Sequence, residues 1–179
     1  MSRELIFQIL INAIFLALIL LFGILPEPAA GIVSKFHPVL FFAVLSGVLT
    51  GPAFGAGIGI AAPILLYFLF HKVPFLPETV TYFVAAGAAG LVSGLFYGWF
   101  WTAVGTTVAA VVVWCFSFGL TKLFSLLSVG ESYFITNYFS DVFASYWPGI
   151  VQTLLLVPAV TVFLRKKGAM WVLRRERDD

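Results

Sequence analysis

The chain has one cysteine and two histidines, and this scarcity excludes several kinds of site. Cys115 stands alone in an apolar stretch, so the sequence offers neither a disulfide framework nor a cysteine-based zinc site. His37 and His71 have no neighbouring pattern of metal ligands. No glycine-rich loop ending in Gly-Lys-Ser or Gly-Lys-Thr occurs, which excludes ATP binding by that route. We expect no metal, no cofactor and no enzymatic activity.

Charge is also scarce, and this decides the class of protein. Charged residues make up 10% of the chain and hydrophobic residues 61%, with a mean hydropathy of +1.07. An average soluble chain is roughly a quarter charged. Strands of a membrane barrel would alternate in polarity over roughly ten residues, and no such alternation occurs. The composition therefore predicts an all-α integral membrane protein.

Apolar segments separated by proline, glycine or polar breakers predict six transmembrane helices. The first, about 5–25, exceeds the roughly 7–15 residues of a signal-peptide core, so we expect a retained span. Proline in Thr50-Gly51-Pro52 divides one long apolar run into two helices. The remaining helices are expected at about 39–50, 53–70, 79–98, 100–124 and 148–164. The whole chain, 1–179, is interpreted as a single compact six-helix bundle.

Basic residues predict the orientation of this bundle. Arg3 precedes the first span, and most other basic residues follow the last one. Six spans place both termini on one side of the membrane, and the positive-inside rule makes that side cytoplasmic. The longer connections then face outward. The longest, about 125–147, is rich in aromatic residues and is expected to form a lid with a short amphipathic helix at about 132–145.

Small residues recur at helical spacing in three places. Gly47, Gly51, Gly55 and Gly59 form one series, and Ala86, Gly90, Gly94 and Gly98 form another. Such ridges let helix backbones approach closely, and we interpret both as internal packing. Ala13 and Ala17 lie one turn apart in the first span among bulky side chains. A helix facing only lipid does not need such a notch, so this pair indicates either a partner helix or ordinary packing inside the chain.

Polar side chains inside the expected spans are few, and they form no line of acids or bases. A proton- or sodium-driven carrier usually has such a line. Together with the absence of a nucleotide loop, this pattern favours a protein that captures a ligand but has no energy source of its own.

Two sequence motifs complete this pattern. They are Leu49-Thr50-Gly51-Pro52 and Trp147-Pro148-Gly149-Ile150-Val151-Gln152, the second followed by Leu156-Val157-Pro158. With six helices in about 180 residues and the small-residue notch of the first helix, they resemble a known family, the S components of energy-coupling-factor (ECF) vitamin transporters. The resemblance covers essentially the whole chain. It rests on the order of the motifs and on the topology more than on the individual motifs.

The resemblance implies a substrate-binding subunit of an ATP-driven, ABC-type importer in a bacterial cell membrane. Such a subunit binds a water-soluble vitamin or vitamin precursor from outside with high affinity and topples within the bilayer to release it. A separate transmembrane coupling subunit and two ATPase subunits supply the energy. The coupling subunit is expected to dock on Ala13 and Ala17, which match the family's notch.

The resemblance also implies a ligand site at the outer ends of helices four, five and six and in the first and last external loops. The matching positions are Lys35, His37, Glu78, Tyr82, Lys122, Asn137, Tyr138, Tyr146, Trp147 and Gln152. These types suit a polar heteroaromatic or hydroxylated ligand, because aromatic faces stack while amides and charges orient it. Pantothenate, a pyridoxine-like compound and a pyrimidine precursor all remain open.

Two of these residues have an alternative interpretation. Lys122 either binds an anionic ligand group or extends its ammonium to the membrane interface. Gln152 either contacts the ligand or forms an interhelical hydrogen bond. For the whole chain, the alternative function is a structural membrane scaffold of bacterial cell-wall synthesis with a similar fold. A lipid-modifying enzyme would have to rely on Glu78 and His71, a weak pair.

Overall fold

The computed structural model describes residues 3–25, 36–70, 78–97, 103–129 and 146–166. This part of the chain contains six α-helices and no strands, which confirms the all-helical prediction for the described residues. The helices are α1 (Arg3–Gly23), α3 (Pro38–Thr50), α4 (Pro52–Phe70), α5 (Glu78–Phe96), α6 (Ala103–Val129) and α8 (Tyr146–Lys166).

Four of these helices contain segments long and apolar enough to cross a membrane. The segments are Glu4–Gly23, Pro52–Phe70, Ala103–Leu120 and Tyr146–Leu164. Two further apolar segments are shorter, Pro38–Thr50 in α3 and Val80–Phe96 in α5. The chain is therefore consistent with a multi-pass membrane protein.

The shortest helix, α3, is the centre of the bundle. It contacts all five other helices, and every residue from Ala43 to Thr50 is buried. At about 1.5 Å per residue, its 13 residues extend only about 20 Å. Other helices surround α3, and its side chains are accordingly apolar apart from Ser46 and Thr50.

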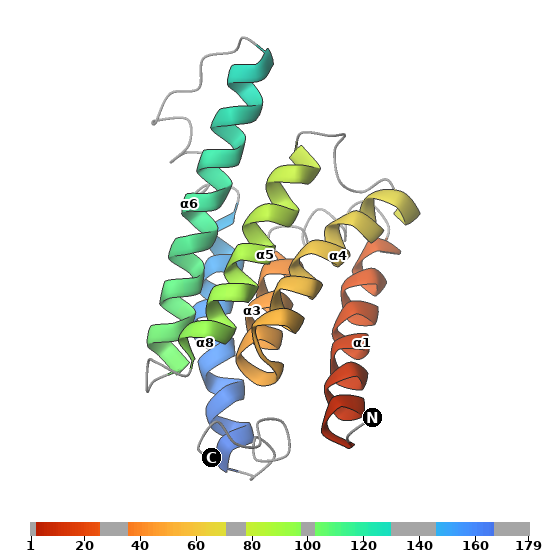
Figure 1. Ribbon diagram of the computed structural model, residues 1–179, viewed down its shortest axis with the longest axis vertical. Coiled ribbons are helices and arrows are strands. Elements are labelled where there is room, and N and C mark those ends of the chain that lie inside the picture. Colours follow the sequence, from red (N-terminus) through yellow and green to blue (C-terminus); the bar gives the residue numbers. More distant parts are fainter. Residues whose placement is uncertain (1–2, 26–35, 71–77, 98–102, 130–145, 167–179) are drawn as a thin grey trace.

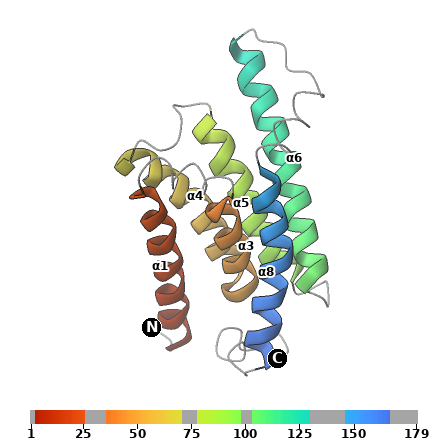
Figure 2. The same cartoon turned by 180° about the vertical axis from the view of Figure 1, so that it is seen from behind.

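The helices alternate in direction, so that the start of α1 and the end of α8 lie at the same end of the bundle (Figure 1). α1 stands on one flank and α6 with α8 on the other, with α3, α4 and α5 between them, and the view from behind agrees (Figure 2). We call the end that holds the last turn of α3 and the first turn of α4 the lower end. The opposite end, where α5 and α8 begin, is the upper end.

Backbone contacts between small residues hold α3, α4 and α5 together. A Cβ atom added at Gly90 of α5 would collide with the carbonyl group of Gly55 in α4. One added at Gly59 would collide with the backbone of Ala86. The Oγ of Ser93 adds a hydrogen bond of 3.1 Å to the carbonyl oxygen of Val44 in α3. These contacts agree with the interpretation of the glycine and alanine ridges as internal packing.

Helix boundaries follow local backbone chemistry. α3 ends at Thr50 and α4 begins at Pro52, with Gly51 between them at a φ of 106°, a conformation that L side chains rarely adopt. α8 begins at Tyr146, so Pro148 lies in its first turn, where a missing backbone N–H is tolerated. α6 continues to Val129, beyond the expected end near residue 124. The expected lid helix at about 132–145 lies outside the described residues.

Candidate functional site

The alanine notch of α1 lies on the exposed surface of the bundle. Ala13 and Ala17 are both exposed. The bulky neighbours Leu10, Ile14 and Leu21 are exposed to 54%, 56% and 61%. In the apolar window of α1, 11% of the residues are buried, against 28–33% in the other three long apolar helices. The notch is thus not used for packing among the described helices.

The opposite side of α1 is attached to the bundle through Asn12. The buried Nδ2 of Asn12 donates to Oγ1 of Thr50 at 3.0 Å and to the carbonyl oxygen of Gln8 at 2.7 Å. The Oγ of Ser46 donates to Oδ1 of Asn12. Ser46 and Thr50 both belong to α3, so this network fixes which face of α1 meets α3 and which face carries the notch.

A second feature occupies the upper part of the bundle, where five ring side chains meet. We call His37, Tyr82, Trp114, Phe118 and Tyr146 the aromatic cluster. The ring centroid of His37 lies 4.3 Å from that of Tyr146, 5.3 Å from that of Trp114 and 5.9 Å from that of Tyr82. Phe118 stacks on Trp114 at 5.3 Å with an interplanar angle of 27°. The cluster therefore joins the residue that precedes α3 to α5, α6 and α8.

Local backbone structure holds His37 inside this cluster. His37 is the N-cap of α3, has a left-handed backbone with a φ of 45°, and precedes Pro38. A Cβ atom added at Gly149 of α8 would lie 2.7 Å from the Cβ of His37. The absence of a side chain at Gly149 thus allows the Cβ of His37 and the carbonyl group of Phe36 to approach α8 closely. His37, expected in an external loop, is a buried residue.

Some polar atoms of the aromatic cluster have hydrogen-bond partners among the described residues, and one does not. The hydroxyl groups of Tyr82 and Tyr146 form a hydrogen bond with each other. Nε2 of His37 is buried and has no hydrogen-bond partner within the described part of the chain. Burial lowers the pKa of His37 to about 4, because desolvation disfavours the charged imidazolium. The ring is therefore neutral near pH 7.

Gln152 of α8 presents a second buried polar atom. Its Oε1 has no hydrogen-bond partner among the described residues. Gln152 lies about one helical turn beyond Gly149, on the part of α8 that approaches His37. Leaving a buried polar atom unpaired costs about 1–3 kcal/mol. Among the described residues, Nε2 of His37 and Oε1 of Gln152 each carry this cost in the same region of the bundle.

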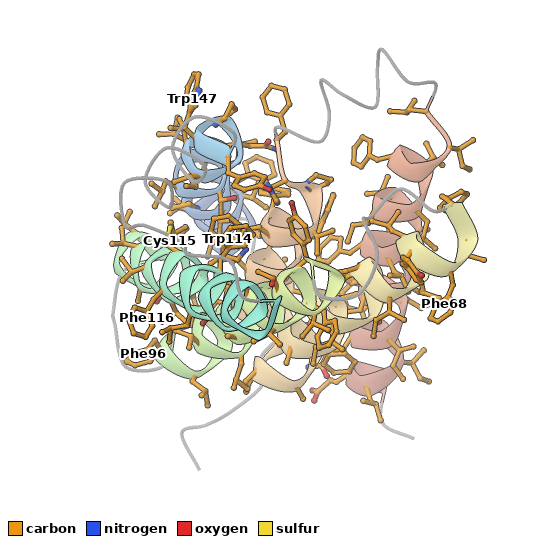
Figure 3. All side chains as sticks on the ribbon, turned by 90° about the horizontal axis from the view of Figure 1, so that it is seen from above. Phe68, Phe96, Trp114, Cys115, Phe116 and Trp147 are labelled. Carbon is orange, nitrogen blue, oxygen red and sulfur yellow. The ribbon has the colours of Figure 1, made fainter. Side chains whose placement is uncertain are left out.

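The structure brings together some of the residues predicted to bind ligand and separates others. His37, Tyr82 and Tyr146 are in mutual contact. Trp147 is 54% exposed and points away from the bundle, whereas Trp114 points between the helices (Figure 3). Trp147 is therefore not part of the aromatic cluster, although the resemblance implied it as a ligand contact.

The other predicted ligand positions lie outside what the structure describes. Lys35, Asn137 and Tyr138 fall outside the described residues. Glu78 begins α5 and Lys122 lies inside α6, but the side chains of both are outside the described part. Their expected roles stay predictions.

Sequence reasoning missed Trp114 and Phe118. They lie four residues apart in α6 and are 1% and 2% exposed, while Phe116 between them is 66% exposed. Spacing of four residues places two side chains on one helical face, which is the available signal for this pair. In a helix that has apolar residues on every side, however, the sequence does not tell which face packs inward.

The described residues contain no group of three or more histidine, cysteine or acidic side chains positioned to hold a metal ion. Comparison with family models, with curated proteins and with solved structures found no match to this chain. The functional interpretation therefore depends on the geometry of the notch and of the aromatic cluster.

Proposed function

We propose that this chain is the substrate-capture subunit, or S component, of an ECF vitamin importer in a bacterial cell membrane. It binds a water-soluble vitamin or vitamin precursor of the pantothenate, pyridoxine-like or pyrimidine type. A separate transmembrane coupling subunit docks on Ala13 and Ala17, and two ATPase subunits supply the energy.

The observation that carries this proposal is the exposure of Ala13 and Ala17 on the least buried of the long apolar helices. Small residues one turn apart are useful where a second helix lies across them, because they let the two backbones approach. The other small-residue ridges are occupied inside the bundle, as the contacts of Gly90 and Gly59 illustrate. The notch of α1 is available to a partner from outside the chain.

The aromatic cluster gives further support. Ligand sites combine apolar and aromatic walls with a few polar groups that orient the ligand. The cluster contributes aromatic rings from α5, α6 and α8, and the buried Nε2 of His37 offers a polar group without a partner in the described residues. This combination favours ligand capture over a purely structural role.

The test separates ligand binding from uptake. Ala13→Trp and Ala17→Trp, singly and together, are compared with the wild type for binding in detergent and for uptake by cells that contain the coupling and ATPase subunits. Ala159→Trp is the matched control, because Ala159 is exposed on α8 and is enlarged equally. We expect all three notch variants to bind ligand normally and to lose uptake, while the control retains both.

Two results would contradict the proposal in different ways. If no vitamin or precursor binds to the wild-type protein, capture is wrong and the scaffold of cell-wall synthesis becomes the better interpretation. If the tryptophan variants lose binding together with uptake, the notch serves internal packing rather than a coupling subunit.

A further inference from the structure

The shape of the aromatic cluster restricts what kind of ligand fits there. Tyr82 lies nearly parallel to His37, at an interplanar angle of 26°, whereas Tyr146 is nearly perpendicular to both, at 77° to His37 and 89° to Tyr82. His37 and Tyr82 thus face each other, while the ring of Tyr146 is edge-on to both. Planar rings gain about 0.5–1.5 kcal/mol from stacked or edge-to-face contacts beyond the burial of their area. Such walls favour a planar ring over a flexible aliphatic chain.

The unpaired Nε2 of His37 determines which kind of hydrogen-bonding group the ligand must have. A neutral imidazole has one N–H donor and one acceptor nitrogen. Buried N–H groups without a partner are rarer than under-satisfied acceptors. We therefore assign the proton to Nδ1, which makes the buried Nε2 an acceptor. Its missing partner is an N–H or O–H donor.

The neighbouring phenol groups do not supply that donor. The hydroxyls of Tyr82 and Tyr146 bond to each other, and neither bonds to Nε2 of His37, although both rings contact His37. The pair joins the N-terminal parts of α5 and α8 across the cluster. Separating the two hydroxyls would leave two groups that can bind a polar substituent next to the acceptor nitrogen of His37.

We propose that the captured ligand is a planar heteroaromatic compound whose N–H or O–H donor binds Nε2 of His37, and whose ring packs against Tyr82 and Tyr146 once the hydrogen bond between their hydroxyls has opened. This inference depends on the capture function proposed above and narrows its ligand class to pyridine- or pyrimidine-type compounds. Pantothenate, which has no ring, is excluded.

The charge of the site agrees with this assignment. Because its pKa is lowered to about 4, His37 is neutral near pH 7 and provides no positive charge for a carboxylate. A neutral acceptor instead suits an uncharged donor, such as the hydroxyl of a pyridinol or the exocyclic amine of an aminopyrimidine.

The experiment uses three probes on the full-length protein in detergent, with binding measured by calorimetry. Pyridoxine and a hydroxymethyl aminopyrimidine represent the two heteroaromatic types, and pantothenate represents the acyclic type. We expect at least one heteroaromatic probe to bind and pantothenate not to bind. His37→Phe keeps a planar ring but removes the acceptor, and we expect it to weaken binding about tenfold, the equivalent of one hydrogen bond. His37→Gln restores an acceptor and is expected to recover part of the affinity.

A matched control distinguishes the loss of a contact from a general loss of packing. Phe42 forms ring pairs with Phe15 and Phe41, at 5.2 and 5.0 Å, and is not part of the aromatic cluster. We expect Phe42→Leu to lower the thermal unfolding midpoint without changing the affinity. The thermal midpoint is measured for every variant, so that affinity is compared only among folded proteins.

The possible outcomes separate this inference from the proposed function. Binding of pantothenate without either heteroaromatic probe leaves the capture function in place and overturns the ligand class. Equal affinity of a heteroaromatic probe for wild type, His37→Phe and His37→Gln overturns the role of His37. If none of the three probes binds, the ligand class is wrong, and a wider vitamin panel decides whether the capture function also fails.

Discussion

The Nδ2 of Asn12 donates a hydrogen bond of 3.0 Å to the Oγ1 of Thr50, and this bond joins α1 to the central helix α3. Asn12 also accepts a hydrogen bond from Ser46, so both of its side-chain polar atoms are satisfied. Ala13, the next residue in sequence, faces away from the bundle and is exposed. The buried amide of Asn12 is thus adjacent in sequence to the exposed notch. The hydrogen bonds of Asn12 fix the rotation of α1 and thereby keep the notch on the outer face.

Replacing Asn12 with leucine should destabilise the protein by about 1–2 kcal/mol. The substitution preserves side-chain size but removes the hydrogen bonds to Thr50 and Ser46, and interhelical hydrogen bonds in membranes are each worth about 0.6 kcal/mol on average and up to about 1.7. Equilibrium unfolding in mixed micelles measures the change. Ile14→Ala, an exposed position on the same helix, is the control and should change stability less. Equal effects of the two variants would show that the network does not hold α1.

Replacing Gly90 with alanine should destabilise the protein by about 1–3 kcal/mol, the usual cost of overpacking. The added Cβ would collide with the carbonyl group of Gly55, which is backbone and cannot rotate away. Gly57→Ala is the matched control, because a Cβ there would meet no atom within 4 Å. Alanine is favoured over glycine in helices by about 1 kcal/mol, so the control should be neutral or stabilising. Thermal unfolding of both variants in one detergent tests this difference, and a destabilising Gly57→Ala would contradict the assigned packing.

The helices themselves were predictable because their chemistry is local. Apolar runs of helical length have few alternatives in a bilayer, where every backbone polar group needs an internal partner. Pro52 and Gly51 indicate the break between α3 and α4 directly. The positions of the helix ends depend less on local sequence signals. α6 continues past residue 124 through Ser125-Leu126-Leu127-Ser128-Val129, in which neither proline nor glycine provides a stop signal.

The site was less predictable because its geometry depends on which faces pack. The sequence identifies Tyr82 and Tyr146 as polar aromatic residues near helix ends, but it does not reveal that their hydroxyls meet. Trp147 and its neighbour Tyr146 look alike in sequence, but successive residues of a helix point about 100° apart, and only Tyr146 belongs to the aromatic cluster. Trp114 lies in a helix that has apolar residues on every side. Three-dimensional packing decides between residues that look alike in sequence.

Lowering the pH should destabilise the protein through His37. The pKa of this residue is lowered from 6.5 to about 4, so the unfolded chain takes up a proton at a higher pH than the folded protein does. The contribution of the neutral His37 ring to the free energy of unfolding is fully present above pH 6.5. It is lost as the pH falls from 6.5 to about 4. The full loss corresponds to about 3 kcal/mol. His37→Gln does not titrate, so the difference in stability between wild type and variant should change across this window. A constant difference from pH 7 to pH 4 would contradict the burial of a neutral imidazole.

Ligand binding should change the fluorescence of Trp114 rather than that of Trp147. The ring of Trp114 lies 5.3 Å from His37 and 5.8 Å from Tyr146, whereas Trp147 is exposed and points away from the bundle. A ligand that enters the aromatic cluster alters the surroundings of Trp114 directly. We therefore expect Trp147→Phe to retain the ligand-dependent change in emission and Trp114→Phe to lose most of it. Calorimetry on both variants establishes that ligand still binds, so that a lost signal is distinguished from lost affinity. The opposite result, with the signal lost in Trp147→Phe and retained in Trp114→Phe, would place the ligand outside the aromatic cluster and remove the basis for its contact with His37.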